Sequence, residues 1–331
     1  MSDRRARAVF FTAERQVEVR PVEVQPAAGE QLIESRLIGI SHGTEMLCYR
    51  GKLPEADPEE TLGSLPQTLA YPLRYGYINV GVREDGVRVF AFYPHQDRFS
   101  VPESAAIPLP DSLRDDDAVF FASMETALGI VHDAAPRLGE TVAVFGTGVI
   151  GLLTATLFME GGAQVFAVEP ATFRREKAGE IGCAVIDPGT EDPAGRLREE
   201  TGGRGVDIAV NTSATDAGLQ SAIDAACMEG TVVEASWPGS QLSRLALGGA
   251  FHRRRLTIKS SQVSRLAPSL TPRWDKGRRA GVVLDLLERI EPRRFISHRF
   301  PLSRAADAFR LIDEDAGRTL QVILDPQEKE P

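Results

Sequence analysis

The sequence contains little cysteine, few aromatic residues and no long apolar run. Of its 331 residues only three are cysteines (Cys48, Cys183 and Cys227), and 7% are aromatic. Three cysteines are too few for a disulfide framework or a four-cysteine zinc lobe, so we interpret them as buried thiols in a reducing compartment. No apolar stretch approaches the roughly 18 residues that predict a membrane-spanning helix, so we expect no membrane partner.

Basic residues are outnumbered by acidic ones, 38 to 47. The formal net charge is −9, which argues against a dedicated nucleic-acid binder, because such domains are usually basic. The segment Met1–Arg7 is basic, but it runs into the strand-like segment Ala8–Phe11 without the apolar region and cleavage site of a secretory signal. We therefore expect a cytoplasmic protein whose partner is a small-molecule substrate.

The pattern along the chain changes twice. Length alone predicts about two domains. Residues 1–120 resemble short strands separated by turns, and Pro54–Pro72, with four prolines, is interpreted as a surface excursion. Residues 121–262 alternate short apolar runs with runs of helical spacing, which indicates βαβ units and a parallel sheet. The alternation stops in 263–331. We expect an α/β protein in which the parallel-sheet domain is inserted between two parts of a mostly-β domain.

The inserted domain is predicted in most detail. We expect strands at Thr141–Phe145, Gln164–Val168, Val185–Ile186, Asp207–Val210, Thr231–Ala235 and Leu256–Ser260, and helices at Ile150–Glu160, Phe173–Ile181, Ala194–Thr201 and Asp216–Met228.

A glycine-rich turn follows the first of these strands. Its residues, Gly146, Thr147, Gly148, Val149, Ile150 and Gly151, form a G-x-G-x-x-G string that opens an apolar helix. In this context the first glycine permits a tight turn, the second allows a pyrophosphate to approach, and the third lets helix and strand pack closely. The free N–H groups of the helix N-terminus favour phosphate. The turn therefore predicts a dinucleotide site.

The second strand ends at Glu169, 18 residues after Gly151. A carboxylate at this position accepts the ribose hydroxyls of NAD and repels the 2′-phosphate of NADP. Arg174 and Arg175 follow, and a nearby arginine accommodates NADP unless it is simply solvated on its helix. We expect NAD as the cofactor, with NADP as the alternative.

Polar residues follow the later strands. In open parallel sheets the ligand lies at the carboxyl ends of the strands. This rule predicts further cofactor contacts from Asn211, Thr212, Ser236 and Ser261, although each could instead cap a helix or fill a turn.

Several strings show that the chain resembles the medium-chain dehydrogenase/reductase superfamily over essentially its full length. They are Gly39–Glu45, Met124–Ala127, Leu138–Glu140 and Gly317–Val322. Ser41–Glu45 with Tyr49–Gly51, Tyr75–Gly81 and Pro94–Gln96 look most like the branch that contains bacteriochlorophyllide hydroxyethyl dehydrogenase.

The resemblance implies a GroES-like catalytic domain, an inserted Rossmann domain and a nicotinamide cleft between them. It adds Thr126 to the expected cofactor contacts, and it implies a homodimer paired through Leu256–Ser260. The zinc ligands of the family are missing, however. Ser41 stands for the cysteine, Tyr77 lies where a histidine is expected, and Phe120–Ala122 offers no ligand. A hydroxyl, a phenol and an apolar ring do not form a zinc site, so we expect no metal.

Without zinc, side chains must stabilise and protonate the developing alkoxide. By family geometry the candidates are Ser41, His42, Thr44, Tyr77, His95 and Glu125, with Glu45 in place of the acid that supports the metal ligands. We expect His42 or His95 to donate the proton, because imidazole titrates near neutrality. Ser41 and Tyr77 would bind the substrate oxygen. Each residue could instead be structural, and Glu125 could cap a helix.

These patterns favour an NAD(P)-dependent, zinc-independent oxidoreductase that acts on a secondary alcohol or ketone, including bulky biosynthetic intermediates. Two alternatives remain open: a C=C reductase of the enoyl or quinone type, and a dinucleotide-binding protein without catalysis. The basic run His252–Arg255 is interpreted as a solvated face; the alternative is that it attracts an anionic substrate or the cofactor phosphates.

Overall fold

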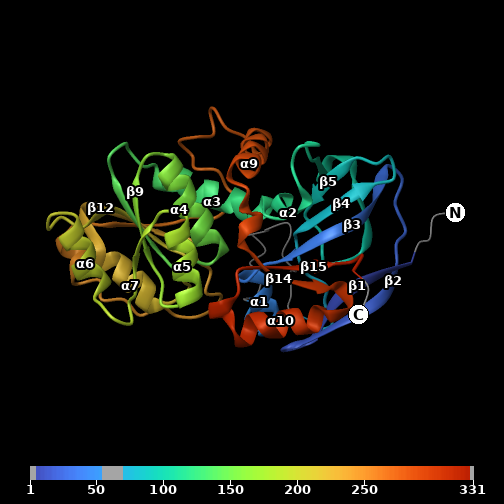
Figure 1. Cartoon of the computed structure of the whole chain (residues 1–331), viewed down its shortest axis with the longest axis horizontal. Helices are drawn as coiled ribbons and strands as arrows, with labels where there is room; N and C mark the ends of the chain where they lie inside the picture. The colour runs from blue at the N-terminus through green and yellow to red at the C-terminus, as the bar shows by residue number, and fades with distance from the viewer. Residues whose placement is uncertain (1–4, 54–69, 329–331) are drawn as a thin grey trace. The chain divides into compact units, whose positions relative to one another are not determined.

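A computed structural model describes residues 5–53 and 70–328 (Figure 1). Most of Pro54–Pro72 lies outside the described residues. The chain divides into two compact units, Met1–Ala122 with Gly281–Pro331, and Ser123–Ala280. We call them the GroES-like unit and the Rossmann unit. The chain passes from one to the other within α3 (Phe121–Ala134) and again within α9 (Lys276–Ile290).

The GroES-like unit is built on two sheets whose strands are antiparallel except for the parallel pair β14 and β15. β1 (Arg5–Ala13) and β2 (Gln16–Glu23) form a two-stranded sheet. A larger sheet has the order β14-β15-β3-β4-β5-β7, with β6 also paired to β3. These strands are β3 (Glu30–Ile40), β4 (Asn79–Arg83), β5 (Arg88–Ala91), β6 (Arg98–Pro102), β7 (Ala106–Pro108), β14 (Ile296–Pro301) and β15 (Gln321–Asp325). In Figure 1 the red strand β15 lies beside the blue strand β3, so the end of the chain completes the sheet that its start begins.

A helix near the C-terminus covers the core of this unit. α10 (Ala305–Glu314) buries Ala305, Ala308, Phe309 and Ile312, a spacing that presents one apolar face. The Phe309 ring packs edge-on against Phe11 at 5.1 Å and stacks on Tyr49 at 5.7 Å. Tyr49 ends α1 (Thr44–Tyr49), a short helix that the sequence analysis does not predict. This packing fixes α1 and the polar residues it carries.

The Rossmann unit contains a six-stranded parallel sheet of order β10-β9-β8-β11-β12-β13. This is the arrangement of two mononucleotide-binding halves joined at a switch point between β8 and β11. The strands are β8 (Thr141–Phe145), β9 (Gln164–Val168), β10 (Ala184–Ile186), β11 (Val206–Asn211), β12 (Ala226–Glu234) and β13 (Thr257–Ser260). The helices are α4 (Val149–Glu160), α5 (Thr172–Glu180), α6 (Pro193–Glu200), α7 (Asp216–Ala225) and α8 (Ala250–Arg253). The predicted fold class is confirmed.

Two element boundaries of the Rossmann unit differ from the prediction by more than one residue. α7 ends at Ala225 and β12 begins at Ala226, although the sequence predicts helix to Met228 and a strand from Thr231. The reason is pairing: Ala226 aligns with Val206 of the neighbouring strand, and this ladder converts the end of an amphipathic run into strand. In the described part of the chain, no helix is long and apolar enough to cross a membrane.

The Rossmann unit extends to Ala280 rather than to residue 262. A buried ion pair explains the difference. The Arg279 guanidinium lies 2.8 Å from Oε1 of Glu125 in α3, and it donates to the Val263 carbonyl at 2.7 Å. The side chains of Arg279 and Glu125 are only 3% and 13% exposed. These contacts hold the segment after Val263 against α3.

Replacing Arg279 by Met removes the cation and leaves Glu125 buried alone. We expect unfolding of the Rossmann unit to become easier by about 3–5 kcal/mol, because an uncompensated buried charge is costly. Burial already raises the pKa of Glu125, against the effect of Arg279. The loss should therefore shrink in acidic buffer, where Glu125 is neutral in both the folded and the unfolded state.

Chemical denaturation followed by tryptophan fluorescence measures this loss, since both tryptophans, Trp237 and Trp274, lie in the Rossmann unit. The exposed neighbour Arg273→Met is the matched control and should change stability by less than about 0.5 kcal/mol. An equally small effect of Arg279→Met would contradict the structural role of the pair.

Candidate functional site

The glycine-rich turn between β8 and α4 is closed by backbone contacts. Gly146 has φ +92°, and a Cβ there would lie 2.9 Å from the Ser213 Cα. A Cβ on Gly151 would lie 2.0 Å from the Gly146 carbonyl oxygen. Neither position accepts a side chain. Around Gly148 the nearest atom to such a Cβ is Nη1 of Arg174 at 3.9 Å, so the space above the turn is open. The glycine-rich turn and the first turn of α4, which contains Val149 and Ile150, together form an open cradle. This cradle fits a pyrophosphate.

Glu169 lies directly beside this turn. Its Oε2 accepts hydrogen bonds from the Thr147 N–H at 2.7 Å and the Thr147 hydroxyl at 3.3 Å, and its Oε1 accepts the Ala171 N–H at 2.9 Å. The side chain is almost fully buried. A carboxylate oxygen is able to accept two hydrogen bonds, so Glu169 retains capacity to accept further bonds from hydroxyl groups.

The two arginines after Glu169 differ in their surroundings. Arg175 donates to the carbonyls of Glu169 and Pro170 at 2.8 and 2.9 Å and pairs with Asp187 at 2.9 Å. Arg174 lies over the open cradle at Gly148. Burial lowers the pKa of the Arg174 guanidinium, and the charge of Glu169 opposes this shift. A phosphate in the cradle would therefore find Arg174 as its neighbouring cation.

The polar residues at the ends of β11, β12 and β13 are held by protein contacts. The Thr212 hydroxyl donates to the Gly146 carbonyl at 2.7 Å, which ties β11 to the glycine-rich turn. Asn211 binds Ser213 and Glu234, Ser236 binds Glu234, and Ser261 donates to Asp133 at 2.7 Å. Thr126 lies half-buried in α3. The cofactor roles predicted for these residues stay predictions.

The sequence analysis missed Glu234, and it grouped Arg279 with the basic residues that follow His252–Arg255 rather than with Glu125. Glu234 is the last residue of β12 and binds both Asn211 and Ser236. The strand-end rule that selected Ser236 could have found it two residues earlier. Arg279 pairs with Glu125 across a separation of 154 residues, and no local sequence pattern predicts that contact. Glu125 lies inside α3 rather than at a helix start, so it is an ion-pair partner and not a cap.

In the GroES-like unit, three hydroxyl groups come together. The Tyr77 hydroxyl lies near the side-chain hydroxyls of Ser41 and Thr44, and both of these neighbours lower its pKa. Thr44 begins α1, and Ser41 lies just before it. Burial raises the pKa of Tyr77 above its ordinary value, and the nearby charge of Glu45 raises it further. The phenol therefore keeps its proton through neutral pH, as a hydrogen-bond donor requires.

Glu45 and His95 form a buried pair next to this cluster. Nε2 of His95 lies 2.6 Å from Oε2 of Glu45, and both side chains are 0% exposed. The approach depends on Gly76, where a Cβ would lie 2.5 Å from the His95 ring. Among the described residues, Nδ1 of His95 and Oε1 of Glu45 have no hydrogen-bond partner. His42 lies half-buried in the turn before α1.

The described residues do not fit a bound zinc ion. In that part of the chain no group of three or more His, Cys, Asp or Glu side chains could hold a metal. Burial raises the pKa of Cys48 and of Cys183 to about 12, so both thiols are protonated at neutral pH. Glu125 already has a cationic partner in Arg279.

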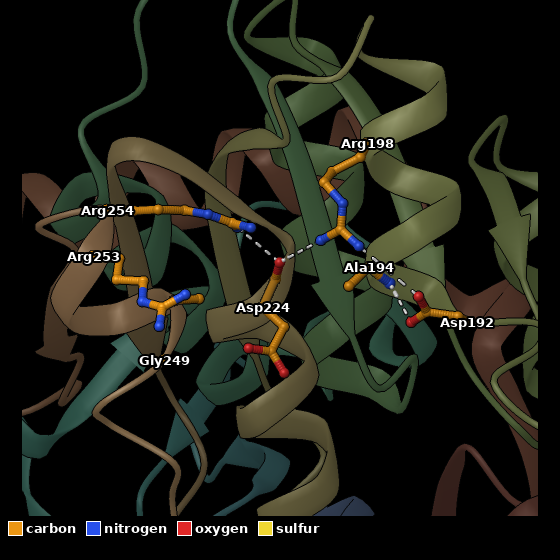
Figure 2. Close-up of a pocket in the computed structure, with 8 residues that line it drawn as sticks. Asp192, Ala194, Arg198, Asp224, Gly249, Arg253 and Arg254 are labelled. Atoms are coloured by element: carbon orange, nitrogen blue, oxygen red, sulfur yellow. Dashed lines mark hydrogen bonds and ion pairs between the residues drawn. The ribbon is translucent and has the colours of Figure 1, made fainter.

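A cavity of about 380 Å³ on the Rossmann unit is separate from the candidate cofactor site (Figure 2). Arg198 and Arg254 both donate to the Asp224 carbonyl, at 3.0 and 2.9 Å, and Arg254 also binds the Ala226 carbonyl. Ala226 begins β12, so the cavity lies toward the amino ends of the strands. Arg254 of the predicted basic run therefore stabilises the end of α7, at the opposite edge of the sheet from the glycine-rich turn.

The architecture defines a class of protein: a GroES-like unit interrupted by a Rossmann unit with a glycine-rich turn. Comparison with known proteins agrees with this class. The model of the zinc-binding dehydrogenase family matches residues 149–275. (R,R)-butanediol dehydrogenase of Bacillus subtilis is 35% identical over 167 residues, which cover 50% of this chain and 46% of that protein. Starvation-sensing protein RspB of Escherichia coli is 24% identical over 331 residues, 90% of this chain and 93% of that one.

Solved structures show the same fold. The butanediol dehydrogenase of Bacillus subtilis superposes with a TM-score of 0.79 at 20% identity, covering 97% of this chain and all of the other. RspB of Escherichia coli, in complex with NADH, gives 0.78 at 21% identity, covering 98% of this chain and all of the other. The zinc-binding dehydrogenase family is therefore matched over residues 149–275, and the whole chain shares the fold of these solved dehydrogenases.

Proposed function

We propose that this chain is an NAD(P)-dependent oxidoreductase that transfers a hydride between the cofactor and a secondary alcohol or ketone without zinc. The observation that carries the proposal is a cluster of three hydroxyls, in which Tyr77 and Ser41 stand where the family resemblance leads us to expect metal ligands and Thr44 lies beside them. Oxyanion stabilisation by hydrogen-bond donors is an established substitute for a Lewis acid. The branch resemblance favours a bulky substrate.

The glycine-rich turn, the N-terminus of α4 and Glu169 support a nicotinamide dinucleotide as cofactor. When bound, this group supplies or accepts the hydride. Relatives of the same fold have been solved with NADH and, in a Sinorhizobium meliloti protein, with NADP. Glu169 favours NAD over NADP because its buried carboxylate would repel a 2′-phosphate. In this proposal the Arg174 guanidinium binds the pyrophosphate of the cofactor.

At the substrate, Tyr77 is the proposed hydrogen-bond donor to the reacting oxygen. Its raised pKa keeps the phenol neutral, and the hydroxyls of Ser41 and Thr44 lie beside it. Of the two histidines proposed as proton donors, His95 is fully buried and bound to Glu45, so it acts on the site through Glu45. His42, half-buried at the start of α1, is the candidate for direct proton transfer.

We also propose a homodimer paired through β13. This strand is at the edge of the parallel sheet, where it pairs with β12, and its four residues are exposed or half-exposed. An uncovered strand edge is a ready template for a second copy of the chain.

The proposed activity is tested with purified protein, NADH or NADPH, and a panel of bulky ketones and conjugated enones. We expect ketone-dependent oxidation of the reduced cofactor, no stoichiometric zinc by metal analysis, and no loss of rate with a chelator. Bound zinc whose removal abolishes turnover would contradict the metal-free proposal. Reduction of enones alone would favour C=C chemistry, and silence toward every substrate with intact cofactor binding would favour a non-catalytic protein.

Replacing Tyr77 by Phe removes the donor but keeps the ring. We expect kcat for ketone reduction to fall by about 10²–10³-fold, a magnitude typical of losing one oxyanion donor, with an unchanged Kd for NADH. Tyr75→Phe, an adjacent buried tyrosine, is the matched control and should retain activity. An unchanged kcat in Tyr77→Phe would show that Tyr77 does not take part in the reaction.

Replacing Glu169 by Gln tests cofactor choice. Gln keeps one acceptor but lacks the charge that repels a 2′-phosphate, so we expect the ratio of NADPH to NADH affinity to rise by about tenfold, roughly 1.4 kcal/mol. Fluorescence titration with both cofactors measures this ratio. Glu160→Gln, at the end of α4, is the control. An equal loss of both affinities would show that Glu169 only supports the turn.

A further inference from the structure

Glu234 presents a fixed negative charge at the carboxyl edge of the Rossmann sheet. Its Oε2 accepts a hydrogen bond from Nδ2 of Asn211 at 2.7 Å, and its Oε1 accepts the Ser236 N–H at 2.9 Å together with the Ser236 hydroxyl. All of these donors are neutral. In the part of the chain that the structure describes, no cationic side chain forms an ion pair with Glu234. Its charge is therefore oriented but not neutralised.

The donors themselves are held in place. Oδ1 of the buried Asn211 accepts the N–H and the hydroxyl of Ser213, at 3.2 and 2.7 Å. These two contacts fix which end of the Asn211 amide faces Glu234. Asn211 and Glu234 are paired in register at the ends of β11 and β12, next to Ser260 of β13. The network spans the second half of the sheet.

The position of this network assigns it to one half of a bound dinucleotide. A doubly wound sheet binds one mononucleotide with each half, on either side of the switch point. The first half, β8 to β10, carries the glycine-rich turn and Glu169, which suits the adenosine ribose. By elimination, the second half, β11 to β13, is expected to bind the nicotinamide mononucleotide. Glu234 belongs to that half.

We infer that Glu234 is a specificity-determining residue that favours the oxidised form of the cofactor over the reduced form. The inference rests on the proposed use of a nicotinamide cofactor. The oxidised nicotinamide ring is a cation and the reduced ring is neutral, so a fixed carboxylate on this half of the sheet attracts only the oxidised form. Tighter binding of the oxidised product favours carbonyl reduction on the enzyme.

The test measures affinities rather than turnover. Titration calorimetry of the full chain with NAD⁺ and with NADH gives two dissociation constants for each variant. For Glu234→Gln we expect the affinity for NAD⁺ to fall by about tenfold, while that for NADH changes by less than about twofold. Glu229→Gln, at the other end of β12 and about 16 Å away along the strand, should change neither affinity.

A second variant separates charge from structure. In Glu234→Gln the new amide faces Nδ2 of Asn211, so two donors meet. The double variant N211D/E234Q removes this conflict. Its new carboxylate at position 211 would accept hydrogen bonds from the new amide at position 234 and from Ser213, while the oxygen of that amide accepts from Ser236. The variant also returns the negative charge to the network. We expect it to recover the preference for NAD⁺ over NADH.

The outcomes are distinct. A selective loss of NAD⁺ affinity in Glu234→Gln, reversed in N211D/E234Q, supports the inference. Equal losses for NAD⁺ and NADH mean that Glu234 only maintains the fold of this edge, and they overturn it. If the unaltered protein binds neither cofactor, the proposed function itself fails.

Discussion

The carbonyl oxygen of Gly146 lies where the first strand of the parallel sheet, the following helix and the end of β11 meet. It accepts the Thr212 hydroxyl at 2.7 Å, and it lies 2.0 Å from where a Cβ on Gly151 would be. This contact is possible only between glycines, and it brings the N-terminus of α4 over the switch point. Glu169 binds the adjacent Thr147 of this turn, and Asn211 at the end of β11 is paired in register with Glu234 of β12.

The GroES-like unit holds several polar side chains inside an apolar core. α1 is fixed by the packing of Tyr49 on Phe309, and it carries Thr44 and Glu45 toward Tyr77 and His95. Burial raises the pKa of Tyr77, so the phenol remains a donor. In the proposed chemistry, these hydroxyls stabilise the reacting oxygen in place of a zinc ion.

Local patterns were sufficient for much of the Rossmann unit. Parallel strands buried on both faces give continuous apolar runs, so β8 and β9 could be predicted from the sequence at their observed bounds. The glycine-rich turn and Glu169 were also found, because their spacing is set by one βαβ unit. β12 was predicted five residues too short at its start, since its first residues become strand only by pairing with β11.

The sequence by itself determined the fold class and the glycine-rich turn, because each follows from patterns of residues close together in the chain. Only the tertiary structure decided which polar and charged groups meet. Glu125 and Arg279, Glu45 and His95, and Asn211 and Glu234 are separated by 154, 50 and 23 residues. Such pairs form when packed elements bring distant positions together and exclude water. A local sequence pattern therefore does not predict them.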